Sequence, residues 1–170
     1  MPIRDARSGD LPRILAIYNE VIATSTAVYS TEPSTLGERS EWFEQRRQRG
    51  FPVLVAAEGD QVLGFSSFGE FRGAFSGYLH SVEHSVHVDA EARGAGIGRQ
   101  LVAALFPLAA AQGKHLMIGA VDAANEGSLR FHERLGFEQV GHFREVGRKF
   151  DRWLDLVFVQ RFLDPPGSAR

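Results

Sequence analysis

The chain has 170 residues, which corresponds to one domain of ordinary size. A hydrophobic fraction of 44% and a charged fraction of 24% are typical of a globular protein and exclude a disordered chain. The net charge of -2 argues against a nucleic-acid partner, and the absence of cysteine excludes disulfides, thiolate metal sites and a cysteine nucleophile.

The sequence shows neither the apolar region of a signal peptide nor the long apolar run of a membrane span. We therefore expect no membrane association and a cytoplasmic location. Residues 1–163 are expected to form a single domain. The segment 164–170 contains two prolines and is expected to be a flexible tail.

The first third of the chain is predicted to contain a strand and two helices. Residues 3–7 read as a short strand, and Asp10 can cap the helix that follows, where apolar residues recur at helical spacing. Thr35 and Glu38 fit a capping box, which opens a second helix that extends to about Arg49. The basic cluster at the end of this helix is expected to be solvated.

The rest of the chain alternates strands with helices. Pro107 is expected to kink or shorten the helix that contains it. The resulting order is βααβββαβαββ, so the predicted fold class is α/β (α+β) around a mixed sheet. The strands are predicted at 53–57, 62–68, 81–88, 116–121, 137–146 and 153–162, and the helices after residue 98 and at 126–135.

A glycine-rich turn, Arg93-Gly94-Ala95-Gly96-Ile97-Gly98, follows a predicted strand and opens a helix. Glycines let backbone amides approach a ligand, and a helix N-terminus adds unpaired N–H groups, so this pattern is suited to phosphate. The dinucleotide fingerprint would need a third glycine where Arg99 stands, and the P-loop spacing also fails. A tight turn that binds nothing is the plain alternative.

Two motifs and the element order resemble the GNAT superfamily of N-acetyltransferases. Arg93-x-x-Gly96-x-Gly98 matches its Arg/Gln-x-x-Gly-x-Gly/Ala signature, and Asn125-x-x-Ser128 followed by Leu135-Gly136-Phe137 matches its second region. The resemblance implies a mostly antiparallel central sheet flanked by helices, and acetyl-CoA as co-substrate without a metal. The residues implied to bind acetyl-CoA are Val86, His87, Val88, Arg93, Gly94, Ala95, Gly96, Ile97, Gly98, Arg99, Asn125 and Ser128.

A closer resemblance is to the phosphinothricin N-acetyltransferase group. It rests on the run from Arg72 to Val86 and on the segments 129–133, 146–149 and 153–155. The group acetylates the α-amine of phosphinothricin, methionine sulfoximine or methionine sulfone, and its members are commonly dimers. The resemblance therefore implies a small amino-acid substrate and a homodimer. Trp153 and Leu156 are expected to lie in the sheet core or in a dimer interface.

Two residues are candidates for proton transfer. Glu83 is an acid within an apolar strand, where it could deprotonate an amine directly or through water; a solvent-facing or ion-paired glutamate is the alternative. His132 stands in the region where many GNAT members carry a tyrosine that protonates the leaving thiolate, so it could be an acid or a second base. A hydrogen-bonded structural histidine is equally compatible with the sequence.

Arg72 is the candidate for substrate recognition, because a guanidinium can bind a carboxylate through two parallel hydrogen bonds. Phe75 and Tyr78 could form a wall of the pocket, and His84 and Ser85 could line it beside Glu83. A surface arginine and local packing are the alternatives. Two other functions stay open, acetylation of a polyamine, aminoglycoside or protein N-terminus, and a non-catalytic acyl-CoA sensor that would need no base.

Overall fold

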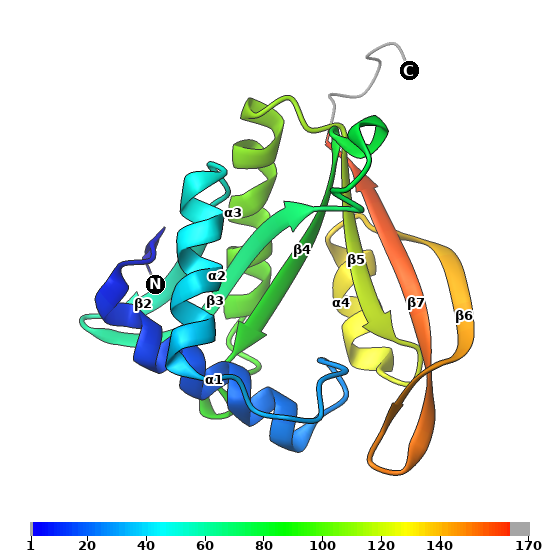
Figure 1. The fold of residues 1–170 in the computed structure, drawn as a ribbon, viewed down its shortest axis with the longest axis horizontal. Coiled ribbons are helices and arrows are strands. Elements are labelled where there is room, and N and C mark those ends of the chain that lie inside the picture. Colours follow the sequence, from blue (N-terminus) through cyan, green and yellow to red (C-terminus); the bar gives the residue numbers. More distant parts are fainter. Residues whose placement is uncertain (1, 164–170) are drawn as a thin grey trace.

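The computed structural model describes residues 2–163, and the segment 164–170 that was predicted to be a tail lies outside them. Within this range the chain forms one sheet with helices on both faces (Figure 1). The predicted order βααβββαβαββ is confirmed. The elements are β1 Ile3–Asp5, α1 Leu11–Thr24, α2 Leu36–Gln48, β2 Val53–Glu58, β3 Gln61–Glu70, β4 Ser81–Val88, α3 Ile97–Ala111, β5 Leu116–Asp122, α4 Glu126–Arg134, β6 Glu138–Lys149 and β7 Arg152–Phe162.

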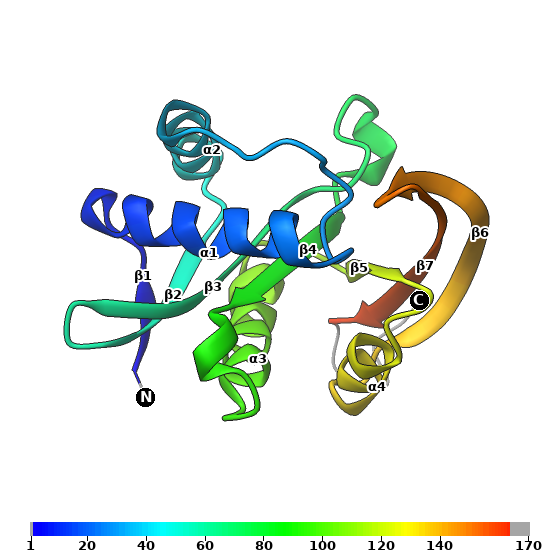
Figure 2. The ribbon, with the colours of Figure 1, turned by 90° about the horizontal axis from the view of Figure 1, so that it is seen from below.

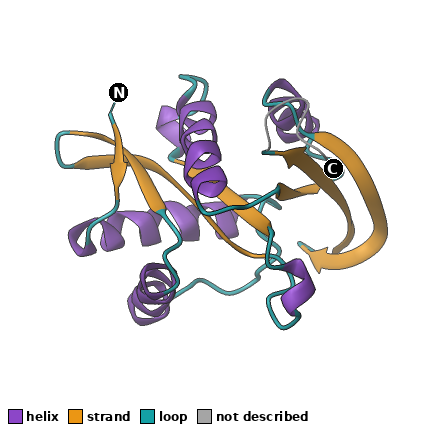
Figure 3. Cartoon of the chain, turned by 90° about the horizontal axis from the view of Figure 1, so that it is seen from above, coloured by secondary structure: helices purple, strands orange, loops and turns teal. Residues whose placement is uncertain are grey.

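The sheet has the strand order β1-β2-β3-β4-β5-β7-β6. Every neighbouring pair is antiparallel except β4 and β5, which run parallel. Helices α1 and α2 cover one face of the sheet, and α3 and α4 cover the other (Figures 2 and 3). The predicted mixed, mostly antiparallel sheet flanked by helices is therefore confirmed.

The apolar run of β2 explains how the two layers are held together. Because successive side chains of a strand point to opposite faces, Leu54 and Ala56 pack with α3, while Val53 and Val55 pack with α1 and α2. Phe68 of β3 is fully buried in the first cluster, and Phe65 is 1% exposed in the second. The central strands are thus buried on both faces, which fixes their register.

Two local predictions need correction. The Asp10 carboxylate does not cap α1; it accepts hydrogen bonds from the Arg7 backbone and the Arg4 guanidinium and closes a short 3-10 turn before the helix. Helix α3 is not shortened at Pro107 but continues to Ala111, and the flanking Leu105 and Ala109 are fully buried. The alternative expectation of a kink at Pro107 stays a prediction. The capping box of Thr35 and Glu38 at the start of α2 is confirmed.

Candidate active site

The parallel pair β4 and β5 separates part-way along the sheet. The two strands pair only from Ser81 with Leu116 to Glu83 with Ile118, after which they diverge toward Val88 and Asp122 (Figure 1). Beyond Glu83, β4 continues to pair with β3 along its other edge. The edge of β4 that faces β5 is therefore available to an extended ligand, as the resemblance implied for the backbone at 86–88.

The glycine turn lies beside this divergence and leads into α3. Gly94 and Gly96 have φ values of 84° and 78°, in the left-handed region that favours glycine. Apart from its own chain neighbours, no described residue has an atom within 4 Å of a Cβ built on either glycine. The first N–H groups of α3 follow at once, since the helix begins at Ile97 with Gly96 as its N-cap. The turn thus combines open space with unpaired donors.

A cavity of about 670 Å³ adjoins the turn and fits a phosphate-bearing ligand. Its lining includes the predicted residues from Gly94 to Arg99 except the exposed Ala95, together with Val86, Val88 and Ser128. Arg93, Arg99, Arg130 and Arg134 also line it and give it a positive charge. Arg93 additionally holds the turn in place, because it donates to the Val88 carbonyl and pairs with Glu20.

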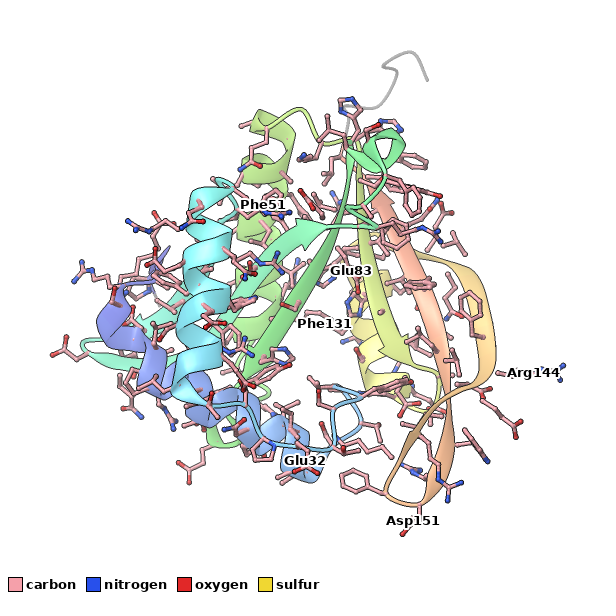
Figure 4. The ribbon with its side chains drawn as sticks, viewed as in Figure 1. Glu32, Phe51, Glu83, Phe131, Arg144 and Asp151 are labelled. Carbon is pink, nitrogen blue, oxygen red and sulfur yellow. The ribbon has the colours of Figure 1, made fainter. Side chains whose placement is uncertain are left out.

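A second cavity, of about 330 Å³, lies against β4 and shares Val86 and Ser128 with the first. All five residues from Glu83 to His87 line it, and so do Asn125 and His132. Asn125 also caps α4, where its side chain accepts a hydrogen bond from the Ser128 backbone. The two cavities therefore adjoin each other between the glycine turn and Glu83. Figure 4 labels Glu83 on β4 and Phe131 on α4, on the two sides of this region.

Glu83 is half-buried, and burial raises the pKa of its carboxyl. The nearby Arg46 guanidinium opposes this shift and lowers the Glu83 pKa. Gly69 is the cross-strand partner of Glu83, and the space above it holds the guanidinium, since a Cβ at Gly69 would overlap Arg46. The arrangement gives a carboxylate that is partly withdrawn from water and has one cation beside it.

The expectation that the basic cluster ending α2 is solvated is wrong for Arg46. Arg46 is partly buried, and its Nε atom has no hydrogen-bond partner among the described residues. Its neighbours Arg47 and Arg49 are exposed, as expected. The difference follows from helical spacing, because Arg46 lies one turn after Trp42, on the face of α2 that packs toward the sheet.

His132 and His84 form a buried pair beneath the gap. His132 Nδ1 lies 2.7 Å from the Ser128 carbonyl, so this nitrogen carries the proton. His132 Nε2 then accepts from His84 Nε2 at 3.2 Å. Burial lowers the pKa of both rings, to about 3 for His84, which favours the neutral form of each at physiological pH. His132 can protonate a thiolate from Nε2 only if it first receives a proton there, so its predicted role as an acid stays a prediction.

Arg72, Phe75 and Tyr78 lie together on the connection between β3 and β4. The Arg72 guanidinium lies 5.6 Å from the Phe75 ring centroid and 5.3 Å from that of Tyr78. All three side chains are exposed, and none lines either of the two cavities described above. The structure does not bring them to Glu83 within this chain, so their predicted contact with a substrate stays a prediction.

Arg39 was missed by the sequence analysis although it lines the same cavity as Glu83. Its guanidinium lies over the rings of Tyr18 and Trp42, and only 8% of the residue is exposed. The sequence feature that could have indicated its burial is its spacing, because Arg39 stands three residues before Trp42 and seven before Arg46. This spacing places all three residues on one face of α2. An arginine on a predicted helix is expected to face solvent unless the element that packs against that helix is known.

Comparison with known proteins identifies the family. The model of the acetyltransferase (GNAT) family matches residues 14–137. The chain belongs to this family. A methionine sulfoximine/methionine sulfone acetyltransferase of Pseudomonas aeruginosa is 48% identical over 98% of this chain and 97% of its own length. The resemblance to GNAT acetyltransferases predicted from the motifs is therefore confirmed.

Two solved structures share the fold closely. A phosphinothricin acetyltransferase of Sinorhizobium meliloti in complex with acetyl-CoA has a TM-score of 0.93 and 34% identity over 99% of this chain and 91% of that one. A ribosomal-protein-alanine N-acetyltransferase of Brucella melitensis has a TM-score of 0.93 and 44% identity over 95% and 99%. The GNAT chain described here is thus an acetyl-CoA-dependent acetyltransferase.

Proposed function

We propose that the chain transfers an acetyl group from acetyl-CoA to the α-amine of a small amino acid of the methionine sulfone, methionine sulfoximine or phosphinothricin type. The observation that carries the proposal is the half-buried Glu83 in the cavity that continues from the glycine turn. The Pseudomonas relative is a methionine sulfoximine/methionine sulfone acetyltransferase, which supports this substrate class. The similar Brucella structure is that of a ribosomal-protein-alanine N-acetyltransferase, which favours an alanine at a protein N-terminus as the second candidate substrate.

The residues of the chain divide the reaction between them. The first backbone amides of α3 and the arginines of the larger cavity bind the phosphates of acetyl-CoA. The unpaired edge of β4 binds the extended arm that joins these phosphates to the thioester. Acetyl-CoA supplies an acetyl thioester. Glu83 accepts a proton from the substrate ammonium, so that the amine nitrogen regains its lone pair. The nitrogen attacks the thioester carbonyl directly and the C–S bond breaks. The nitrogen then loses a second proton as it becomes an amide, and this loss balances the proton that the leaving thiolate takes up to become a thiol.

A turnover screen with acetyl-CoA tests the substrate class. Methionine sulfone, methionine sulfoximine and phosphinothricin are compared with a polyamine, an aminoglycoside and a peptide beginning with alanine. We expect the three amino acids to be acetylated with the highest kcat/KM. A higher value for the peptide would instead favour the second candidate.

Changing Gly96 to alanine is expected to weaken acetyl-CoA binding at least about tenfold, because the added methyl group occupies space that the phosphates need. Gly113→Ala is the matched control, since Gly113 also has a positive φ of 70° and open space but ends α3 instead of opening it. Both variants bear the same backbone strain. Calorimetry with acetyl-CoA should separate them, and equal affinities would leave the turn without a binding role.

Changing Arg46 to glutamine is expected to move the acidic limb of the kcat/KM profile to higher pH. Arg46 lowers the pKa of Glu83, so its removal raises that pKa and a higher pH is needed to obtain the carboxylate. Arg47→Gln removes an exposed arginine from the same helix and should leave the limb in place. An unmoved limb in the Arg46 variant would show that Glu83 does not set it.

We also propose that the protein is a cytoplasmic homodimer. Five large apolar side chains on the β6–β7 hairpin are more than half exposed, which supports their burial against a second copy of the chain. Trp153 is one of the five, so it does not lie in the core of this chain. The side chains are Val140, Phe143, Val146, Phe150 and Trp153. Light scattering should give twice the mass of the chain for the native protein, and a lower mass for a Trp153→Glu variant.

Among the described residues, no helix is long and apolar enough to cross a membrane. No cluster of three metal-binding side chains occurs among them either. The cytoplasmic location is proposed because acetyl-CoA is available in that compartment.

A further inference from the structure

Arg39 is a buried cation held between two helices. Its guanidinium carbon lies 4.0 Å from the ring centroid of Tyr18 on α1 and 4.6 Å from that of Trp42 on α2. Although 92% of the residue is buried, its Nε atom has no hydrogen-bond partner among the described residues. The side chain lines the cavity that contains Glu83.

The positive charge of Arg39 is poorly compensated within the protein. Tyr18 is the group that attracts it most strongly, partly through a hydrogen bond, but Tyr18 carries no full negative charge at neutral pH. The acidic group that acts on it is Glu38, whose carboxylate already accepts from the Thr35 backbone at 2.7 Å at the start of α2. Burial lowers the pKa of Arg39, which shows that desolvation outweighs these attractions. Stacking on aromatic rings offsets part of this cost, and an anionic hydrogen-bond acceptor in the cavity would offset more.

The other charges of the cavity do not neutralise Arg39. Glu83 has its own cation, since Arg46 is the charged group that lowers its pKa. Asp122 accepts hydrogen bonds from the Thr26 hydroxyl and the Ala124 backbone. His87 lies nearby as well, and burial, the largest cause, together with the charge of Arg39 lowers its pKa to about 4, so it is neutral at physiological pH.

The cavity is therefore lined by one arginine, Arg39 on α2, and by two carboxylates, Glu83 on β4 and the hydrogen-bonded Asp122 at the end of β5. Of the two carboxylates, Glu83 is the one whose pKa is raised by burial, so it is the candidate base. This pattern is complementary to a zwitterion with an anion at one end and an amine at the other. A guanidinium is also suited in shape to a carboxylate, which it can bind through two parallel hydrogen bonds.

We infer that Arg39 binds the α-carboxylate of the amino-acid substrate and thereby orients its α-amine toward Glu83. This inference rests on the proposed function and adds to it a specificity-determining residue inside the cavity. It also differs from the expectation for Arg72, which lies on an exposed loop outside the cavity.

The test measures kcat/KM for three amines with the native enzyme and with Arg39→Gln, Arg39→Lys, Arg72→Gln and Arg47→Gln. The amines are methionine sulfone, methionine sulfone amide, which lacks the carboxylate, and methionine, which lacks the sulfone. We expect Arg39→Gln to lower kcat/KM at least about tenfold for the two acids and less than threefold for the amide. Arg39→Lys should restore part of the loss, and Arg47→Gln should match the native enzyme.

The affinity for acetyl-CoA, measured by calorimetry, should be unchanged in the Arg39 variants, because Arg39 does not line the larger cavity. An equal loss on the acids and the amide would assign Arg39 to packing and overturn the inference. A loss confined to methionine sulfone and its amide would assign Arg39 to the sulfone oxygens and also overturn it.

Loss of acid-over-amide discrimination in Arg72→Gln alone would place the carboxylate at the loop and overturn the inference while the proposed function stands. Failure of the native enzyme to acetylate methionine sulfone, methionine sulfoximine and phosphinothricin alike would overturn the proposed function, and the inference with it. A failure of the proposed function shows in the native enzyme alone, whereas a failure of the inference shows only in the comparison of the variants. The two failures are therefore distinguishable.

Discussion

Changing Glu83 to glutamine is expected to lower kcat at neutral pH by about 10²–10⁴-fold while acetyl-CoA binding is retained. An ammonium has no lone pair with which to attack a thioester, and Glu83 lines the cavity beside the gap between β4 and β5. The other carboxylate that lines it, Asp122, accepts hydrogen bonds from the Thr26 hydroxyl and the Ala124 backbone. Burial already raises the pKa of Glu83, which strengthens it as a base, and an amide of the same shape cannot accept the proton.

The loss should become smaller as the pH rises toward the pKa of the substrate amine, because more of the amine is then neutral before it binds. Glu58→Gln, which removes an exposed carboxylate at the end of β2, serves as the control and should behave like the native enzyme. Steady-state kinetics across this pH range and calorimetry with acetyl-CoA provide the measurements. A native kcat and pH profile in the Glu83 variant would reduce Glu83 to a structural glutamate.

The elements that sequence reasoning predicted well are those whose signal is local. The capping box of Thr35 and Glu38 and the glycine turn before α3 depend on residues a few positions apart, so the sequence contains all of their partners. The continuous apolar run of β2 likewise indicates, from the sequence alone, a strand that is buried on both faces of the sheet. The glycine turn, which we propose as the phosphate site, was therefore predictable from the sequence as a local structure.

The substrate side depends on contacts between distant segments. Arg39 and Arg46 are buried because α2 packs beside Tyr18 of α1 and above Gly69 of β3, and neither contact leaves a mark in the sequence around the arginines. Asp10 was misassigned for a different reason, because its nearby partners Arg4 and the Arg7 backbone donate to its carboxylate in place of the first amides of α1. A charged residue is assumed to be exposed until its packing partner is known.

Acidification is expected to destabilise the fold through His84. Its ring is 7% exposed, it donates from Nε2 to His132, and its Nδ1 has no partner among the described residues. Burial, with smaller repulsions from His132 and His87, lowers the pKa of His84 to about 3 in the folded chain, against 6.5 for an ordinary histidine.

The unfolded chain therefore binds a proton that the folded chain does not bind between pH 6.5 and about 3, so the free energy of unfolding falls as the pH falls through this range. At about 1.4 kcal/mol per pH unit, the contribution of His84 reaches about 3 kcal/mol at pH 4. His84→Gln can still donate to His132 but does not titrate, and its urea unfolding should depend less on pH by this amount. The exposed His80→Gln should keep the native slope, whereas equal slopes in all three proteins would mean that His84 is already protonated in the fold.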